Sequence, residues 1–190
     1  MIPGIIAGQM QLAGGLWTPI NMTVMPEVYL DAHSSSVTDV SGLAAAISNL
    51  GAMGAPGDFS QATAANRPSI LSAELNGKRI LRFDGSNDVL LGSSADQKDL
   101  FRNVSAAWSF IVYKKRSADV STATRALFYS AVGGGTTARF AVYSGLGVAG
   151  GENKPLLRVA RLDADATANL SASLASSGGY VMVLHAINYS

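Results

Sequence analysis

An Asn-Gly pair at residues 76–77, set between two apolar runs, constrains this chain more than any other feature. Asn-Gly is the strongest short signal for a β-hairpin, because a type I′ turn needs a positive φ at both central residues. Ser69–Leu75 precedes the pair and Lys78–Phe83 follows it. We therefore predict two antiparallel strands, with Leu81 and Phe83 facing a core.

A second reversal follows at residues 84–88, where Asp-Gly-Ser-Asn-Asp places a turn-forming residue at every position. Val89–Leu91 then resumes a strand. Pro68 suits the beginning of a strand, because proline has no amide hydrogen to donate to the ladder. Residues 66–91 therefore predict an antiparallel sheet, and the spacing of strands along the rest of the chain is that of an all-β sandwich.

Several strings in and around this block carry a resemblance to a known family. They are AlaAlaAsnArgPro at 64–68, LeuAsnGlyLys at 75–78, ArgPheAspGlySerAsnAsp at 82–88, ProGluValTyrLeuAspAla at 26–32 and AlaArgLeuAspAlaAsp at 160–165. With Tyr29 in place of the family's usual Trp, they resemble the concanavalin A-like and laminin G-like jelly-roll domains, in the version found in bacteriophage tail and virion proteins. The resemblance runs from about Pro26 to the C-terminus. It implies an all-β fold, an antiparallel jelly-roll β-sandwich over 26–190 with an extended N-terminal arm over 1–25.

Residues 43–50 leave two interpretations open. Their propensity predicts a short helix that ends before Gly51, whereas the resemblance implies a strand over Ala44–Leu50, which we favour. A strand is also predicted at Glu27–Ala32, and a buried strand at Ala106–Lys114, which is aromatic and β-branched. A short apolar turn beneath the sandwich is predicted at Leu100-Phe101. The other predicted strands are Arg125–Ala131, Arg139–Tyr143, Leu156–Leu162, Ala168–Leu174 and Tyr180–Tyr189.

The resemblance implies one more strand after residue 189, with a LeuTyrValAsnGly-like motif that this chain lacks. Two interpretations stay open. The sequence is a fragment of a longer one, or the sandwich is completed by other means, such as a neighbouring chain. Unpaired sheet edges invite such pairing.

The first 17 residues are apolar, but they are not a signal peptide, because they have no basic region and are interrupted by Pro3 and Gly4. The stretch is also too short and too rich in glycine to span a membrane. It is either a flexible arm or an arm that docks on another subunit. The docking interpretation, which such openings in phage virion proteins favour, uses Ile2, Pro3, Ile5, Ile6, Leu12, Leu16 and Trp17.

The composition excludes several classes of function. The net charge is +1, with 14 basic and 13 acidic residues, so the basic face that nucleic-acid binding needs is not expected. The chain has no Cys, which excludes disulfides and Cys-ligated metals. Only 14% of the residues are charged and 48% are hydrophobic, which suits a protein that buries surface against neighbours as well as against itself.

Two groups of residues are candidates for chemistry. Asp84, Asn87 and Asp88, and separately Asp163 and Asp165, offer oxygen ligands for Ca²⁺, although the same residue types form turns without any metal. Asp31 and His33 would project from one strand face, and His185 lies on the last strand. No Gly-x-Ser-x-Gly elbow and no spacing singles out a nucleophile, so we predict no enzyme activity.

These observations lead to one expected function and one alternative. The resemblance implies a bacteriophage virion structural protein of tail-fibre, tail-tip or decoration type, assembled in the host cytoplasm. Its partners would be other virion proteins, copies of itself, most simply as a trimer, and host-surface glycan, without a cofactor. The alternative is a secreted bacterial carbohydrate-binding module. Its aromatic platforms would come from Trp17, Tyr129, Tyr143, Tyr180 and Tyr189.

Overall fold

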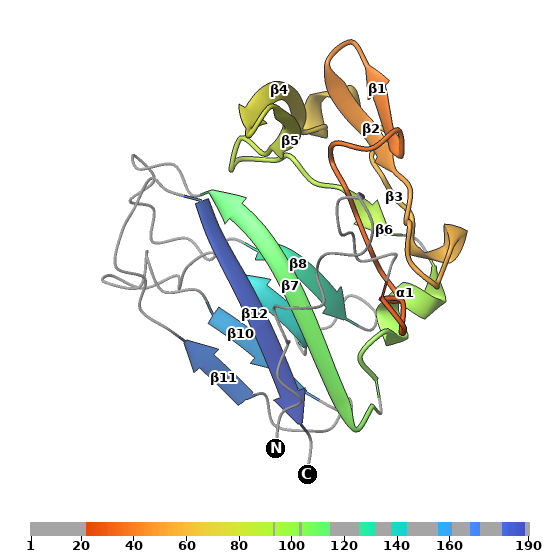
Figure 1. The fold of residues 1–190 in the computed structure, drawn as a ribbon. Helices are drawn as coiled ribbons and strands as arrows, with labels where there is room; N and C mark the ends of the chain where they lie inside the picture. The colour runs from red at the N-terminus through yellow and green to blue at the C-terminus, as the bar shows by residue number, and fades with distance from the viewer. Residues whose placement is uncertain are drawn as a thin grey trace. The chain divides into compact units, whose positions relative to one another are not determined.

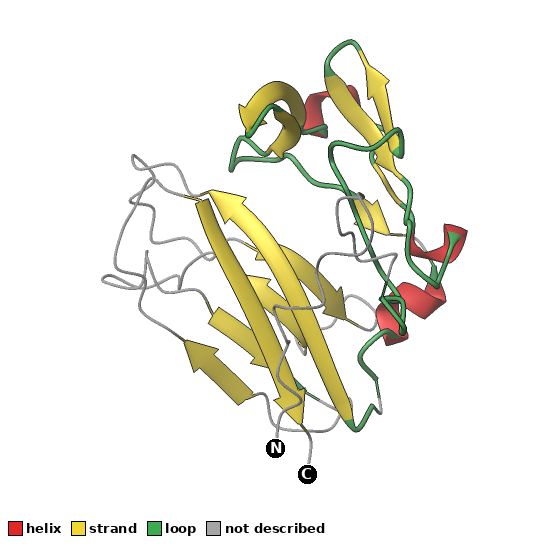
Figure 2. Cartoon of the chain, in the orientation of Figure 1, coloured by secondary structure: helices red, strands yellow, loops and turns green. Residues whose placement is uncertain are grey.

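The computed structural model describes residues 22–92, 94–102, 104–114, 126–131, 138–143, 156–160, 168–171 and 180–188. These residues form antiparallel strands with little helix (Figures 1 and 2), which confirms the predicted all-β class. The chain divides into two compact units, Met1–Ser94 and Ala95–Ser190, which are described separately here. The boundary predicted after residue 25 stays a prediction.

The first unit holds a six-stranded antiparallel sheet in the order β5-β4-β2-β3-β6, with β1 paired to β2. Short 3-10 turns at Ala55–Gly57 and Ala64–Asn66 connect its strands. The strands are β1 (Val37–Val40), β2 (Leu43–Ile47), β3 (Phe59–Ser60), β4 (Ser69–Leu75), β5 (Lys78–Arg82) and β6 (Leu91–Gly92).

The hairpin predicted at residues 76–77 is confirmed. Leu75 pairs with Lys78, and the two turn residues have φ values of 49° and 75°. A second hairpin of the same kind joins β1 to β2, where Ser41 and Gly42 have φ values of 57° and 80°. Residues 43–47 form strand β2, so the strand interpretation is confirmed there and the helix interpretation is wrong. Strand β1 was not predicted.

The core of the first unit contains Val37, Ala44 and Ile47, with Leu81 packed against it as predicted. The prediction that Phe83 faces a core is wrong, because its side chain is 46% exposed. Strand β5 ends at Arg82, one residue earlier than predicted. Phe83 therefore begins the turn and no longer follows the alternation that buries Leu81.

The strand predicted at Glu27–Ala32 is also wrong, because this segment forms no ladder: Glu27 is a bend, Ala32 is a turn, and single backbone bonds such as that from the Leu50 amide to the Tyr29 carbonyl hold it. The side chain of Asn49 replaces part of the ladder. Its Oδ1 accepts a hydrogen bond from the Tyr29 amide at 2.7 Å, and its Nδ2 donates to the Glu27 carbonyl at 3.0 Å. A side chain that stands between two backbones prevents the regular exchange of main-chain hydrogen bonds.

The second unit begins with α1 (Ala95–Asp99) and has two antiparallel sheets. One has four strands in the order β11-β10-β9-β8, and the other is the β7–β12 ribbon of two nine-residue strands. The strands are β7 (Ala106–Lys114), β8 (Ala126–Ala131), β9 (Ala138–Tyr143), β10 (Leu156–Val159), β11 (Ala168–Ser171) and β12 (Tyr180–Asn188). All six were predicted from the sequence, with small differences at their ends.

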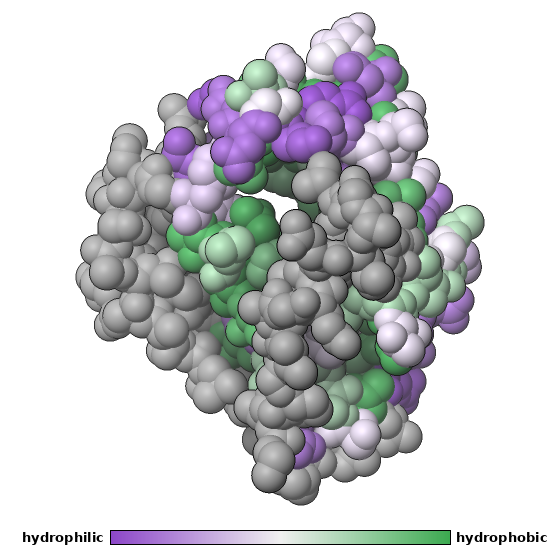
Figure 3. All heavy atoms as spheres, viewed as in Figure 1, coloured by the Kyte–Doolittle hydropathy of each residue, from purple (hydrophilic) through white to green (hydrophobic). Residues whose placement is uncertain are grey.

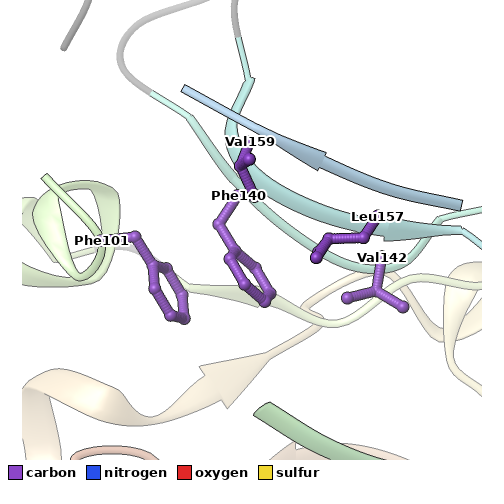
Figure 4. Close-up of a cluster of buried hydrophobic side chains, with 5 residues drawn as sticks. All are labelled: Phe101, Phe140, Val142, Leu157 and Val159. Carbon is purple, nitrogen blue, oxygen red and sulfur yellow. The ribbon is translucent and has the colours of Figure 1, made fainter. Parts of the chain in front are cut away.

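A cluster of buried side chains from β9, β10 and the turn at Phe101 forms the core of the second unit (Figure 4). Phe140 is fully buried and stacks on Phe101, with ring centroids 3.9 Å apart. Phe101 belongs to the apolar turn that was predicted at residues 100–101. Ala107 and Ile111 of β7 and Ile187 of β12 pack against this cluster, so one face of the ribbon lies on the four-stranded sheet.

Candidate functional site

Asp31 and His33 do not form a catalytic pair. Asp31 Oδ1 accepts a hydrogen bond from the His33 backbone amide at 2.9 Å. The Nδ1 atom of His33 accepts one from the Arg79 amide at 3.2 Å, and Arg79 Nη2 donates to the carbonyls of His33 and Ser34. These side chains tie the turn at residues 31–36 to strand β5. Burial, and then the charge of Asp31, raises the pKa of Tyr29, so that its hydroxyl stays protonated.

The calcium candidates Asp84, Asn87 and Asp88 lie together on one loop of the first unit. Asp84 Oδ1 accepts hydrogen bonds from three backbone amides, those of residues 86, 87 and 88, at 2.7–3.3 Å. Asp88 Oδ2 accepts one from the Asp84 amide at 2.8 Å. These oxygens hold the turn closed. Across the described ranges, no three His, Asp or Glu side chains gather as a metal site would require.

The Asn87 side chain connects this loop to the other end of the block that carries the family resemblance. Its Nδ2 donates to the Ala65 carbonyl at 3.2 Å and to Asn66 Oδ1 at 2.9 Å. The Val89 amide donates to the Asn66 carbonyl at 3.0 Å. The strings at 64–68 and 82–88 are therefore in contact, which gives both a structural role. The other candidates, Asp163 and Asp165, lie outside the described residues, and the calcium hypothesis stays a prediction.

His185 has a partner that the sequence did not indicate. It lies opposite Ser109 across the β7–β12 ribbon, and its Nδ1 is 3.2 Å from the Ser109 hydroxyl. Both residues point towards the inner face, where burial lowers the pKa of His185. A hydroxyl beside a neutral imidazole supplies two of the three groups of a catalytic triad, the nucleophile and the base. No carboxylate is recorded in contact with this imidazole within the described ranges, so the pair lacks the group that would orient the base.

The lowered pKa of His185 predicts a stability that depends on pH. Its ordinary value is 6.5. In the unfolded chain the imidazole binds a proton more readily, so the contribution is fully present above about pH 6.5 and is lost as the pH falls through the folded-state value. Urea unfolding curves recorded from about pH 7.5 to pH 5 are expected to show this loss. His185→Gln should flatten it, while Ser109→Ala, which keeps the imidazole, should retain it. An unchanged slope in His185→Gln would contradict the assignment.

The basic run at residues 114–116 begins at the end of β7. The Lys114 ammonium lies 5.4 Å from the centre of the Tyr180 ring on the opposite strand. This cation–π contact gives Lys114 a local partner at the ribbon end. Lys115 and Arg116 lie outside the described residues, as do all seven docking residues of the N-terminal arm.

The largest unexpected feature is the outer face of the ribbon, made of Trp108, Phe110 and Val112 on β7 and Met182, Leu184 and Ala186 on β12. Strand β7 was predicted to be buried, which is wrong for this face. Burial alternates along both strands, and the outer side chains are up to 73% exposed. Figure 3 shows hydrophobic residues at the surface near the upper end of this ribbon. Because both faces are apolar, the sequence could not distinguish a strand covered on two sides from one covered on one side.

Of the aromatic residues suggested as sugar platforms, Tyr129 is 46% exposed and Tyr143 is buried. Tyr180 is half-buried under Lys114, and the other two lie outside the described residues. Comparison of the chain with protein-family profiles, curated proteins and solved structures finds no match. In the described part of the chain, no helix has the length and apolar character needed to cross a bilayer.

Proposed function

We propose that this protein is a structural component of a bacteriophage virion, of tail-fibre, tail-tip or decoration type, which works by binding and not by catalysis. The sequence strings at 64–68, 75–78 and 82–88 support this assignment through their resemblance to jelly-roll domains of virion proteins. The antiparallel all-β architecture is compatible with such a domain. The protein would reach its position in the particle through assembly in the host cytoplasm.

The observation that carries the proposal is the outer face of the β7–β12 ribbon. Five of its side chains are large and hydrophobic, with exposed fractions from 44% for Val112 to 73% for Met182. A contiguous apolar surface made of five large exposed side chains is often functional, because in a free protein it favours association with other molecules. A subunit of an assembly covers such a surface with a neighbour, whereas an enzyme gains nothing from it.

A carbohydrate-binding module is the competing function, and the outer face does not favour it. Sugar sites combine an aromatic platform with polar groups that hydrogen-bond hydroxyls. Trp108 and Phe110 are instead paired across the ribbon with Ala186 and Leu184. A glycan array probed with the purified protein distinguishes the two functions, because specific binding to one glycan class would favour the module.

The N-terminal arm provides the direct test of the virion role. Deletion of residues 1–15 is expected to leave the sheets folded and to abolish incorporation into particles, because the arm would supply the apolar contacts for docking. Mass spectrometry of particles purified from the strain that encodes this chain measures incorporation, and circular dichroism measures folding.

A finer pair of variants controls for added charge in the arm. Ile5→Asp with Ile6→Asp should block incorporation, because charges at docking positions would have to be buried. Gln9→Asp with Gln11→Asp adds the same charge at polar positions and should have little effect. Normal incorporation of the deletion variant would refute the docking role of the arm, and absence of the wild-type chain from all particles would refute the virion role.

A further inference from the structure

The outer face of the ribbon is continuous and carries no charge. Three cross-strand pairs build it: Val112 with Met182, Phe110 with Leu184, and Trp108 with Ala186. Directly opposed side chains on one face of an antiparallel pair touch, so the six residues form one surface. From their exposed fractions, this surface measures on the order of 500 Å², if a fully exposed large side chain offers about 150–250 Å².

On the outer face, polar side chains occur only at the two ends of the ribbon. Lys114 and Tyr180 form one end, and Ala106 and Asn188 form the other, about 27 Å away at the usual rise per residue. The centre of the face therefore offers nothing that would select a charged or strongly polar partner. It is complementary to another uncharged, apolar sheet face.

We propose that a second copy of this chain covers the outer face, ribbon against ribbon, about a two-fold axis near the Phe110–Leu184 pair. A two-fold contact brings the same patch together from both copies. This axis lies in the contact plane, perpendicular to the strands, so it places each strand over its own copy in the reverse direction. Leu184 then meets Leu184, each Lys114 lies near the far end of the partner ribbon, and the two ammonium groups stay apart. This inference rests on the proposed role in assembly, since that role is what identifies the face as a binding surface.

The size and shape of the face suit a pair of copies. Two surfaces of about 500 Å² bury roughly 1,000 Å² in total, which is the lower bound for a specific interface. Flat sheets pack face to face about 10 Å apart, with their side chains interdigitated. Ala186 is the one small residue of the six, and it leaves space beside Trp108 for a side chain of the partner. A trimer would instead require this face to meet a different surface of its neighbour.

Charge reversal at the centre of the face tests for a second copy. The wild-type chain, whose mass is 19.6 kDa, is expected to sediment as a dimer that dissociates on dilution. Leu184→Glu and Leu184→Lys should each weaken the dimer at least about tenfold, because the axis brings two like charges together. A mixture of the two variants should recover dimers that contain one copy of each, as native mass spectrometry would show. Such recovery requires the same residue of both copies to meet.

A matched leucine on another sheet provides the control. Leu127 on β8 is 36% exposed and lies outside the ribbon, so Leu127→Glu should leave the dimer unchanged. The proposal is overturned if the wild-type chain sediments as a monomer at every concentration or as a trimer. It is also overturned if the Leu184 variants still dimerise, or if the mixture fails to recover dimers while both variants remain folded.

Quenching of Trp108 gives a second test that leaves the face intact. The chain has two tryptophans, so Trp17→Phe leaves Trp108 as the only one. Acrylamide quenching of this variant should increase as dilution dissociates the dimer. A Trp108 that is quenched equally in dimer and monomer would place the contact elsewhere. One protected in the monomer would mean that the chain covers the face itself. Both results overturn the proposal and leave the particle experiment, which depends on the arm, unaffected.

Discussion

Replacement of Asn49 by alanine is expected to destabilise the first unit by about 3–5 kcal/mol, one of the two largest effects that this structure predicts. The side chain is 8% exposed. Its Oδ1 accepts hydrogen bonds from the amides of Tyr29 and Gly51, at 2.7 and 2.9 Å. Its Nδ2 donates to the carbonyls of Glu27 and Gly54, at 3.0 and 3.2 Å. Truncation leaves the amides of Tyr29 and Gly51 without this partner, and each group left unpaired costs about 1–3 kcal/mol. The carbonyls of Glu27 and Gly54 each lose one hydrogen bond but keep those from the amides of Met53 and Gly57.

The space around Asn49 is as constrained as its hydrogen bonds. A Cβ atom on Gly57 would lie 2.5 Å from Asn49 Nδ2, so glycine is required there for the amide to fit. Asn49→Asp keeps the acceptor but loses the donor, and it places a carboxylate against two carbonyl oxygens. We expect it to be at least as damaging as alanine at neutral pH, with partial recovery in acid, where a protonated carboxyl can donate again.

Asn87 provides the matched control for this experiment. Its side chain also bonds to the backbone and to another asparagine, but at an exposed position. Asn87→Ala should therefore cost no more than about 1 kcal/mol. Urea unfolding of the full chain measures both variants, and hydrogen exchange at the Tyr29 and Gly51 amides localises the loss. Equal effects of the two variants would show that the burial of Asn49 does not make its hydrogen bonds more costly to lose.

The contrast between the predicted hairpin at residues 76–77 and the failed strand at residues 27–32 shows what the sequence can reveal. A type I′ turn is a local matter, since the two turn residues alone must adopt positive φ, and residues 76–77 do so. The segment at residues 27–32 depends on Asn49, 20 residues away from Tyr29. The apolar pattern of the segment is compatible with a ladder, and nothing near it in the sequence indicates that a side chain takes the place of a strand.

The outer face of the ribbon could not be predicted from the sequence either, because it depends on residues that are far apart in the chain. Strand β7 alternates in burial, but apolar residues occupy both of its faces, so its sequence is that of a strand covered twice. Only the register of β7 with β12 shows which side chains share the outer face. The calcium hypothesis was open for a related reason. Asp84 and Asp88 have oxygen ligands to offer, but their backbone partners become visible only in the folded loop.

Phe140→Ala is expected to destabilise the second unit by about 3–5 kcal/mol, the usual cost of removing a buried phenylalanine side chain. Phe140 is fully buried between the two sheets. Its ring stacks on Phe101 at an interplanar angle of 12° and meets Phe128 edge-on, with ring centroids 6.2 Å apart. Removal of the ring takes away both aromatic contacts and leaves a cavity that neighbouring β-strands cannot easily close.

Two other phenylalanines test whether this cost comes from burial. Phe83, 46% exposed in the first unit, should lose less than about 1 kcal/mol on truncation to alanine, although its sequence position predicted a core residue. Phe110, 55% exposed on the ribbon, should behave similarly at protein concentrations low enough to dissociate the proposed dimer. At higher concentrations its cost should rise, because binding of a second copy adds to apparent stability. If Phe83→Ala cost as much as Phe140→Ala, strand β5 would have to extend beyond Arg82 and bury that ring.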